Sequence, residues 1–287
     1  MRRFDRVIIA DWSASSAPSP ARPCADAIWL GTTSQCPDIT TITEYYRTRA
    51  AAEAAIVAGI NSAIQTGERL LIGFDFPMGY PQGYAERLTG RPAASAVWQW
   101  LADRITDDGN NCNNRFAVAA DINQRLGGNG PFWGRPATMR LENLPMVKSV
   151  DYFRLGLAER RQVETLVPRA QPVWKLYTTG AAGSQGLMGQ PMIHRLSQFP
   201  GVSVWPFDTP TSPVVLAEVY PSLLATAVAK DSAPIKDEVQ VRLLSKAVYN
   251  LAQNQGLEPM LTAPNIALEE GWILGAGHAT ALRDALT

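Results

Sequence analysis

Short apolar runs alternate with one amphipathic stretch over the first eighty residues. Continuous apolar runs, such as Leu-Leu-Ile-Gly-Phe at 70–74, are typical of strands buried on both faces of a sheet. The strands expected here are residues 7–10, 27–30, 39–46 and 70–74. Residues 50–65 carry isoleucine at every fourth position from Ile56 to Ile64, which predicts an amphipathic helix that Gly67 ends. Three strands with short links, then a helix and a further strand, indicate a mixed sheet.

The pattern becomes mainly helical between residues 80 and 200. Loops rich in Gly, Pro and Asn, notably residues 127–131, separate the helical stretches. The expected helices are residues 94–105, 115–126, 152–166 and 187–196. The only strand expected in this part of the sequence is 173–178, where it precedes a glycine-rich turn.

Alternation of strand and helix patterns returns after residue 200. The expected elements are strands at 202–205 and 214–219, a helix at 235–254, and a last helical stretch after Pro264. The layout predicts an α/β fold in a single compact domain. Its core would be formed by residues 1–79 and 201–287, with a largely helical insertion at residues 80–200.

Composition narrows the classes of function. The 287 residues contain 26 Lys and Arg and 26 Asp and Glu, so the formal net charge is zero. This balance argues against a protein that coats nucleic acid or anionic membranes through bulk charge. Two histidines leave little room for multi-histidine zinc chemistry, and three widely spaced cysteines favour unpaired thiols in a reducing compartment. With no apolar segment long enough for a secretory signal or a membrane span, the sequence predicts a cytoplasmic protein.

Carboxylates at the ends of the expected strands are the strongest chemical signal. Asp11 ends the first strand, Asp75 follows the fourth, Glu218 lies near the end of 214–219, and Glu269 and Glu270 lie in the last helical stretch. Two such charges about 4 Å apart repel by roughly 4 kcal/mol at an effective dielectric near 20. A bound cation relieves this repulsion, and oxygen ligands suit Mg²⁺ or Mn²⁺. Taken singly, Asp11 and Asp75 are also ordinary turn or N-cap residues after strands.

Three segments around these acids resemble a known family. They are Ile8-Ile9-Ala10-Asp11-Trp12-Ser13, Ile72-Gly73-Phe74-Asp75-Phe76-Pro77-Met78-Gly79 and Ala217-Glu218-Val219-Tyr220-Pro221. The segments are similar to those of predicted ribonuclease-H-like nucleases, a family known chiefly as a domain of unknown function. The resemblance implies a ribonuclease-H-like mixed sheet flanked by helices. It also implies metal ligation by Asp11, Asp75, Glu218 and Glu270 or Glu269.

The same resemblance extends to basic residues. Lys236 and Arg242 match the Lys and the Arg-containing helix that follow the acidic segment in the family, and with Ser13 they are the candidate substrate contacts. The family helix often has a second acid about one turn on, whereas Ile273-Leu274-Gly275 supplies none. The implied activity is hydrolysis of a phosphodiester with Mg²⁺ or Mn²⁺ as the cofactor.

A mildly basic segment gives this interpretation partial support. Between Arg140 and Lys175 there are seven basic residues and four acidic ones. A local patch of this kind could bind a nucleic acid or a nucleotide-like phosphate, although an ordinary solvated surface has the same pattern. The oligomeric state has no signal in the sequence.

Three other interpretations stay open at this point. Ala182-Gly183-Ser184-Gln185-Gly186 is similar to a hydrolase nucleophile elbow, and Asp208 and His278 follow in the required order for a serine hydrolase. The serines that follow Asp11 resemble the first phosphate loop of actin-like ATPases, which implies ATP phosphotransfer. A degenerate nuclease fold could also serve as a non-catalytic accessory or binding protein.

Overall fold

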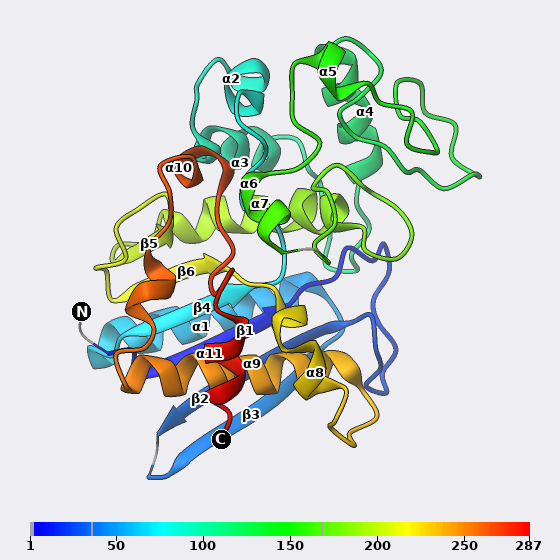
Figure 1. Cartoon of the computed structure of the whole chain (residues 1–287). Helices are drawn as coiled ribbons and strands as arrows, with labels where there is room; N and C mark the ends of the chain where they lie inside the picture. Colours follow the sequence, from blue (N-terminus) through cyan, green and yellow to red (C-terminus); the bar gives the residue numbers. More distant parts are fainter. Residues whose placement is uncertain (1–2, 36, 168) are drawn as a thin grey trace.

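The computed structural model describes residues 3–287 except 36 and 168 (Figure 1). Within these residues the centre is a six-stranded mixed sheet in the order β3-β2-β1-β4-β6-β5. The strands are β1 (Arg6–Asp11), β2 (Ile28–Gln35), β3 (Ile39–Tyr46), β4 (Leu70–Phe74), β5 (Val202–Trp205) and β6 (Val214–Glu218). β2 is antiparallel to both β1 and β3, whereas β1, β4, β6 and β5 run parallel. The expected α/β class and mixed sheet are confirmed.

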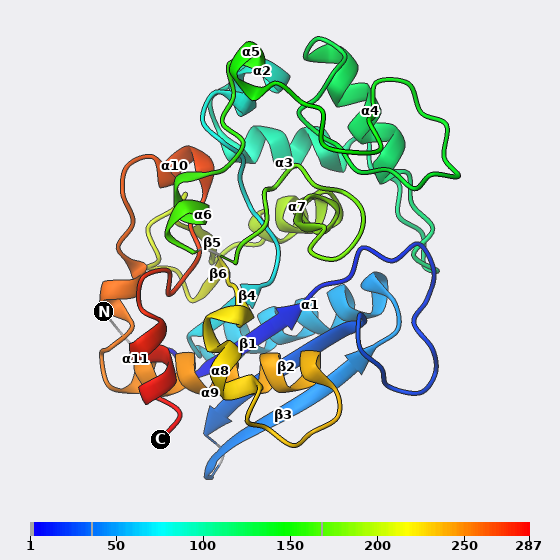
Figure 2. The same cartoon turned by 45° about the vertical axis from the view of Figure 1, so that its right-hand side comes forward.

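Helices cover both faces of this sheet (Figure 2). On one face, Ile56 and Ile60 of α1 (Arg49–Thr66) pack in the same buried cluster as Ile8 of β1. The helix expected at 50–65 is therefore confirmed with one buried face, although Ile64, expected on that face, is exposed. α7 (Ala182–Ser197) contributes to the same layer.

α9 (Lys236–Gln253) covers the opposite face of the sheet and confirms the helix expected at 235–254. Val241 and Leu244 of α9 pack in one cluster with Val7 of β1. The helix approaches β2 so closely that a Cβ on Gly31 would lie 2.5 Å from the Val241 carbonyl oxygen. A glycine at this position of β2 is therefore needed for α9 to lie flat on the sheet.

The segment from Tyr80 to Pro200 lies above the sheet in Figure 1. It contains α7 and the helices α2 (Tyr84–Thr89), α3 (Ala94–Ala102), α4 (Arg115–Arg125), α5 (Tyr152–Leu155) and α6 (Gln162–Leu166). Its apolar cluster is built around Trp174, which lies within 5.3 Å of the ring centres of Tyr80, Tyr84 and Phe132.

Three sequence-based expectations for this segment are wrong. The helix expected at 152–166 is two short helices, because Gly156 ends α5 in the left-handed region with φ at +60°. Residues 173–178 form no strand and make only an isolated bridge between Lys175 and Trp133. The glycine-rich residues from Ala182 onward are the first turn of α7, not a loop before it.

The chain after β6 returns to the sheet edge. A 3-10 helix at Pro221–Leu224 and α8 (Ala225–Val228) lead into α9, and another 3-10 helix at Glu258–Leu261 follows it. The last helical stretch is two helices, α10 (Ala267–Glu270) and α11 (Ala279–Asp284). Between them, Ile273 bridges to Glu218 and so continues the sheet edge.

None of the helices in the described part of the chain combines the length and apolar character needed to cross a membrane. Cys24 and Cys112 are free thiols, whereas Cys36 lies outside the described residues.

Candidate functional site

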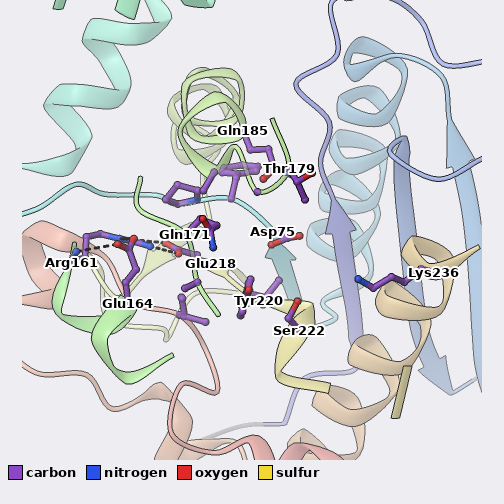
Figure 3. A pocket seen from close by; sticks show the side chains of 17 residues that line it. Asp75, Arg161, Glu164, Gln171, Thr179, Gln185, Glu218, Tyr220, Ser222 and Lys236 are labelled. Carbon is purple, nitrogen blue, oxygen red and sulfur yellow. Dashed lines mark hydrogen bonds and ion pairs between the residues drawn. The ribbon is translucent and has the colours of Figure 1, made fainter. Parts of the chain in front are cut away.

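A pocket of about 280 Å³ opens where β4 and β6 end and the 80–200 segment meets the sheet (Figure 3). The residues that line it and carry polar side chains are Asp75, Arg161, Glu164, Gln171, Thr179, Gln185, Glu218, Tyr220, Ser222 and Lys236. They come from the sheet edge, from the 80–200 segment and from the start of α9. In α/β proteins, the carboxyl ends of parallel strands are the usual place for ligands.

Asp11 and Asp75 end neighbouring parallel strands. Ala10 is paired with Phe74, and the Asp75 amide donates to the Ala10 carbonyl at 2.9 Å. Ala10 and Phe74 pack on the α1 side of the sheet, so alternation along each strand directs the side chains of Asp11 and Asp75 toward the α9 side. The two carboxylates therefore lie next to each other at the sheet edge, Asp11 buried and Asp75 half-buried.

Burial and neighbouring carboxylates raise the pKa of both groups. Desolvation is the largest cause at Asp75, followed by the charge of Glu218, and it raises the pKa to about 7. At Asp11, desolvation and then the charge of Asp75 raise the pKa well above its ordinary value. Within the described chain, neither carboxylate has a hydrogen-bond or ion-pair partner. Asp75 lines the pocket and Asp11 lies beside it at the end of the neighbouring strand, so two carboxylates without a bonded partner meet at this side of the pocket.

At the start of α9, Lys236 lines the pocket, and the charge of the next residue, Asp237, acts on Asp11 and Asp75. The exposed Lys236 ammonium lowers the pKa of both Asp11 and Asp75, and it forms no ion pair with a described residue. Figure 3 shows its amino group directed toward the pocket. Asp237 accepts a hydrogen bond from the Asp26 amide at 2.7 Å, and burial raises its pKa.

Glu218 is bound by an arginine from the 80–200 segment. Arg161 Nη2 donates to Glu218 Oε1 at 2.6 Å and Arg161 Nη1 donates to Glu218 Oε2 at 2.8 Å. Arg161 Nε also donates to Glu164 at 2.9 Å, and all three side chains are buried. The two carboxylates hold the pKa of Arg161 above its ordinary value despite the opposing effect of burial. The Met78 amide adds a bond to Glu218 Oε2 at 2.9 Å.

Glu269 and Glu270 bind backbone amides of the 80–200 segment. Glu270 accepts from the amides of Gln82 at 3.0 Å and Gln162 at 2.7 Å, and Glu269 accepts from the Gly83 amide at 2.6 Å. The backbone of Glu270 also lies against Gly79, where a Cβ would be 2.4 Å from the Glu270 carbonyl oxygen. These two acids therefore fasten the start of the segment and α6 to the C-terminal part of the chain.

The structure thus separates the five predicted metal ligands. Asp11 and Asp75 adjoin each other, and Glu218 shares the pocket with Asp75, but Glu218, Glu269 and Glu270 already bind partners from the 80–200 segment. Among the described residues, no group of three or more His, Cys, Asp or Glu side chains lies close enough to hold a metal ion. The expectation of one acidic cluster is corrected to a pair of carboxylates beside a neutralised glutamate.

The other predicted substrate contacts lie apart from the pocket lining. Ser13 Oγ donates to the Asp26 carbonyl at 3.3 Å and accepts from the Ser15 amide at 3.2 Å. Arg242 is paired with Asp231 at 2.8 Å. Of the three candidates, Lys236 alone is among the residues that line the pocket.

Ser184 lies inside α7. Its hydroxyl donates to the Leu176 carbonyl and accepts from Arg115 Nε at 3.0 Å, and only 2% of the residue is exposed. No hydrogen bond links it to a histidine within the described residues. The sharp strand-to-helix turn that a nucleophile elbow requires is absent from its described surroundings, because Ser184 belongs to the first helical turn after a loop.

Sequence reasoning missed the partners of these acids. In the sequence, Arg161 is only one of several basic residues in the 140–175 segment. The signal that could have found its partner is the acid three positions later, Glu164, a spacing that brings two side chains together on a helix. Among the other pocket residues, Gln185 and Tyr220 lie in segments that the sequence singled out, whereas Gln171 carries no comparable signal. No protein-family model, curated protein or solved structure matches this chain.

Proposed function

We propose that the protein is a divalent-cation-dependent phosphodiester hydrolase whose cation is held by Asp11 and Asp75. The observation that carries this proposal is the pair of adjacent carboxylates without protein partners, next to a pocket and to the ammonium of Lys236. Burial first, and then neighbouring negative charge, raises the pKa of both carboxylates. Such perturbed groups in a pocket favour a functional role over a structural one.

The residues present fit Mg²⁺ or Mn²⁺. Mg²⁺ is commonly bound by one or two carboxylates together with substrate phosphate oxygens and water, so a closed cage of protein ligands is not required. When bound, the cation supplies charge neutralisation and an activated water molecule. Lys236 would hold the substrate phosphate at the mouth of the pocket. Glu218, Glu269 and Glu270 would act as positioning residues that hold the wall of the pocket in place.

The order and direction of the strands support a ribonuclease-H-like fold, which belongs to the same proposal. Antiparallel β1 to β3, followed by α1 and a parallel β4 beside β1, is the arrangement expected of a ribonuclease-H-like sheet. We assign this fold as part of the proposal. It accounts for a carboxylate on β1 next to a carboxylate after β4.

Hydrolysis of thymidine 5′-(p-nitrophenyl phosphate) tests the proposal directly. We expect release of p-nitrophenol with Mn²⁺ or Mg²⁺ and none with EDTA. Asp75→Asn and Asp11→Asn should each lower kcat/KM at least about a hundredfold, which corresponds to roughly 2.7 kcal/mol of transition-state stabilisation. Asp121→Asn makes the same chemical change at an exposed site on α4 and should have no effect. Full activity of Asp75→Asn, or activity that survives EDTA, would exclude this mechanism.

The second candidate is a non-catalytic protein that binds a phosphate ligand through the same pocket. It is favoured by the engagement of Glu218 and Glu270, which leaves two carboxylates where a two-metal site would need more. This candidate predicts a cation-dependent rise in melting temperature without turnover. The hydrolysis assay therefore separates the two candidates.

A further inference from the structure

The size and the charge of the pocket specify its ligand more closely than the proposed reaction does. Its volume of about 280 Å³ lies just below the usual range of small-molecule sites, roughly 300–1,000 Å³. Figure 3 shows Gln171, Thr179 and Gln185 on the side opposite Tyr220 and Ser222, so the 80–200 segment faces the sheet edge across the pocket. The space between them suits a compact ligand.

Contacts within the 80–200 segment keep this wall in place. Gly180 lies directly on the side chain of Gln171, since a Cβ at Gly180 would be 2.7 Å from Gln171 Cγ. The amino group of Lys175 donates to the Thr179 carbonyl at 2.6 Å, and the Gly183 amide donates to the Lys175 carbonyl at 2.9 Å. Gln171 and Thr179, which lie in the same connection between α6 and α7, are therefore held near each other at the rim of the pocket.

The neutral polar groups on this wall can donate hydrogen bonds to a ligand and accept them from it. Gln185 Nε2 donates to the Trp12 carbonyl at 2.7 Å, which fixes the amide and leaves Gln185 Oε1 as an acceptor without a partner among the described residues. Gln171 and Thr179 are exposed at the rim and contribute further donors and acceptors. Such groups match the uncharged polar edges of a base or a sugar.

The charges around the pocket suit a single phosphoester group. Its lining carries three carboxylates and two cations, and the Arg161 charge is already satisfied by Glu164 and Glu218. Lys236 is the cation of the described lining that has no ion-pair partner. A strand with successive phosphates would need a row of such cations, which this lining lacks in the described residues.

We infer that the ligand is a small phosphoester of about mononucleotide size, not an internal segment of a nucleic acid chain. Its phosphate would lie between Asp75 and Lys236, and its uncharged part would contact Gln171, Thr179 and Gln185. The inference rests on the proposed function, because the divalent cation offsets the negative charge of Asp11 and Asp75 when the phosphate binds.

Calorimetric binding with Mn²⁺ tests the inference, with thymidine 5′-monophosphate and a dodecathymidylate strand as the probes. Each basic contact to a single-strand phosphate contributes about −0.7 to the slope of log K against log salt concentration. We expect the strand to bind with a slope no steeper than about −0.7, and the affinities of the two probes to lie within about threefold of each other. Tighter binding of the strand, with a slope beyond about −2, would overturn the inference while the proposed function stands.

Two variants with matched controls locate the contacts. Lys236→Met should weaken binding of the mononucleotide about tenfold and flatten the salt dependence of strand binding, whereas Lys246→Met, on the same helix, should do neither. Gln171→Ala should weaken binding about threefold, and Gln198→Ala, an exposed glutamine outside the pocket lining, should not. If neither probe binds with Mn²⁺ and no phosphodiester is hydrolysed, the proposed function and the inference both fail.

Discussion

The guanidinium of Arg161 and the carboxylate of Glu218 form a buried pair of parallel hydrogen bonds, although the residues are 57 positions apart in the sequence. Their side chains are 2% and 4% exposed. Arg161 belongs to the 80–200 segment and Glu218 ends a central strand, so the pair fastens one part of the molecule to the other. Arg161 also donates to the Glu270 carbonyl at 3.1 Å, which adds the C-terminal part of the chain to the same junction.

Removal of Arg161 should strongly destabilise the fold. Arg161→Met leaves Glu164 and Glu218 buried without their cation, and loss of one partner from a buried pair costs about 3–5 kcal/mol. Urea unfolding at neutral pH measures the free energy of unfolding. Arg125→Met, which breaks an exposed pair with Asp121, should cost less than about 1 kcal/mol. Equal losses in the two variants would show that the Arg161 junction contributes no more than a surface pair.

Asp75 should make the protein less stable as the pH rises. Its pKa is about 7 in the folded protein against an ordinary value of 3.8. The folded state therefore binds the proton more tightly than the unfolded state. Its contribution to stability is fully present below the unfolded pKa and is lost progressively as the pH rises through the folded pKa.

Asp75→Asn should remove this loss of stability at high pH, because the asparagine side chain does not ionise. We expect the variant to be more stable than the original protein by about 1–2 kcal/mol near pH 8, a value reduced from the full shift because Asp75 is partly exposed to solvent. Near pH 4, close to the unfolded pKa, the difference should be much smaller. Thermal melts of the variant and the original protein near pH 4 and pH 8, without divalent cations, measure this difference in stability. Asp121→Asn is the control. A difference that does not depend on pH would contradict the raised pKa.

Divalent cations should stabilise the protein through the same carboxylates. If Asp11 and Asp75 hold Mn²⁺, a concentration one hundred times the Kd adds about 2.7 kcal/mol to the free energy of unfolding. The melting temperature should therefore rise by several degrees at pH values where both groups are ionised. Asp11→Asn and Asp75→Asn should lose the rise, and Na⁺ at matched ionic strength should not produce it. An equal rise in Asp75→Asn would place the cation elsewhere.

The sheet and the position of its acids follow from local signals in the sequence. Buried apolar runs mark β1, β4 and β6, and parallel strands bring Asp11, Asp75 and Glu218 to the same edge. The face of each side chain depends on register, which the sequence does not show. Phe74 is paired with Glu218, so the residue level with Asp75 on β6 is Val219. Glu218 is thereby directed away from the Asp11 and Asp75 side and toward Arg161.

The 80–200 segment was less predictable because its structure depends on distant contacts. Apolar residues between 152 and 166 suggested one helix, yet Gly156 breaks it and the second part turns toward the sheet to deliver Arg161. Residues 173–178 have the apolar character of a strand, but Trp174 is buried among aromatic rings and not in a sheet. Periodicity detects burial in these segments without showing what they pack against.

Gly79 should tolerate no side chain, because it packs on the backbone that carries Glu270. A Cβ at Gly79 would lie 2.4 Å from the Glu270 carbonyl oxygen, an atom that cannot swing away. Gly79→Ala should cost about 1–3 kcal/mol of unfolding free energy. By displacing Glu270 it should also speed hydrogen exchange at the Gln82 and Gln162 amides.

Gly109→Ala is the matched control for this change. A Cβ at Gly109 meets nothing within 4 Å among the described atoms, so its effect should stay within about 0.5 kcal/mol. Unchanged exchange at the two amides in Gly79→Ala would show that Glu270 holds them independently of Gly79.

Ser184 should behave as a structural residue, since its hydroxyl is buried and both of its hydrogen bonds are internal. A fluorophosphonate probe should not label it. Ser184→Ala should lower the free energy of unfolding by about 1–3 kcal/mol, because the Arg115 Nε–H and the Leu176 carbonyl each lose a partner. Ser232→Ala, at an exposed serine, should change little. Labelling that Ser184→Ala abolishes would instead establish a reactive serine and favour the hydrolase interpretation over the phosphodiesterase one.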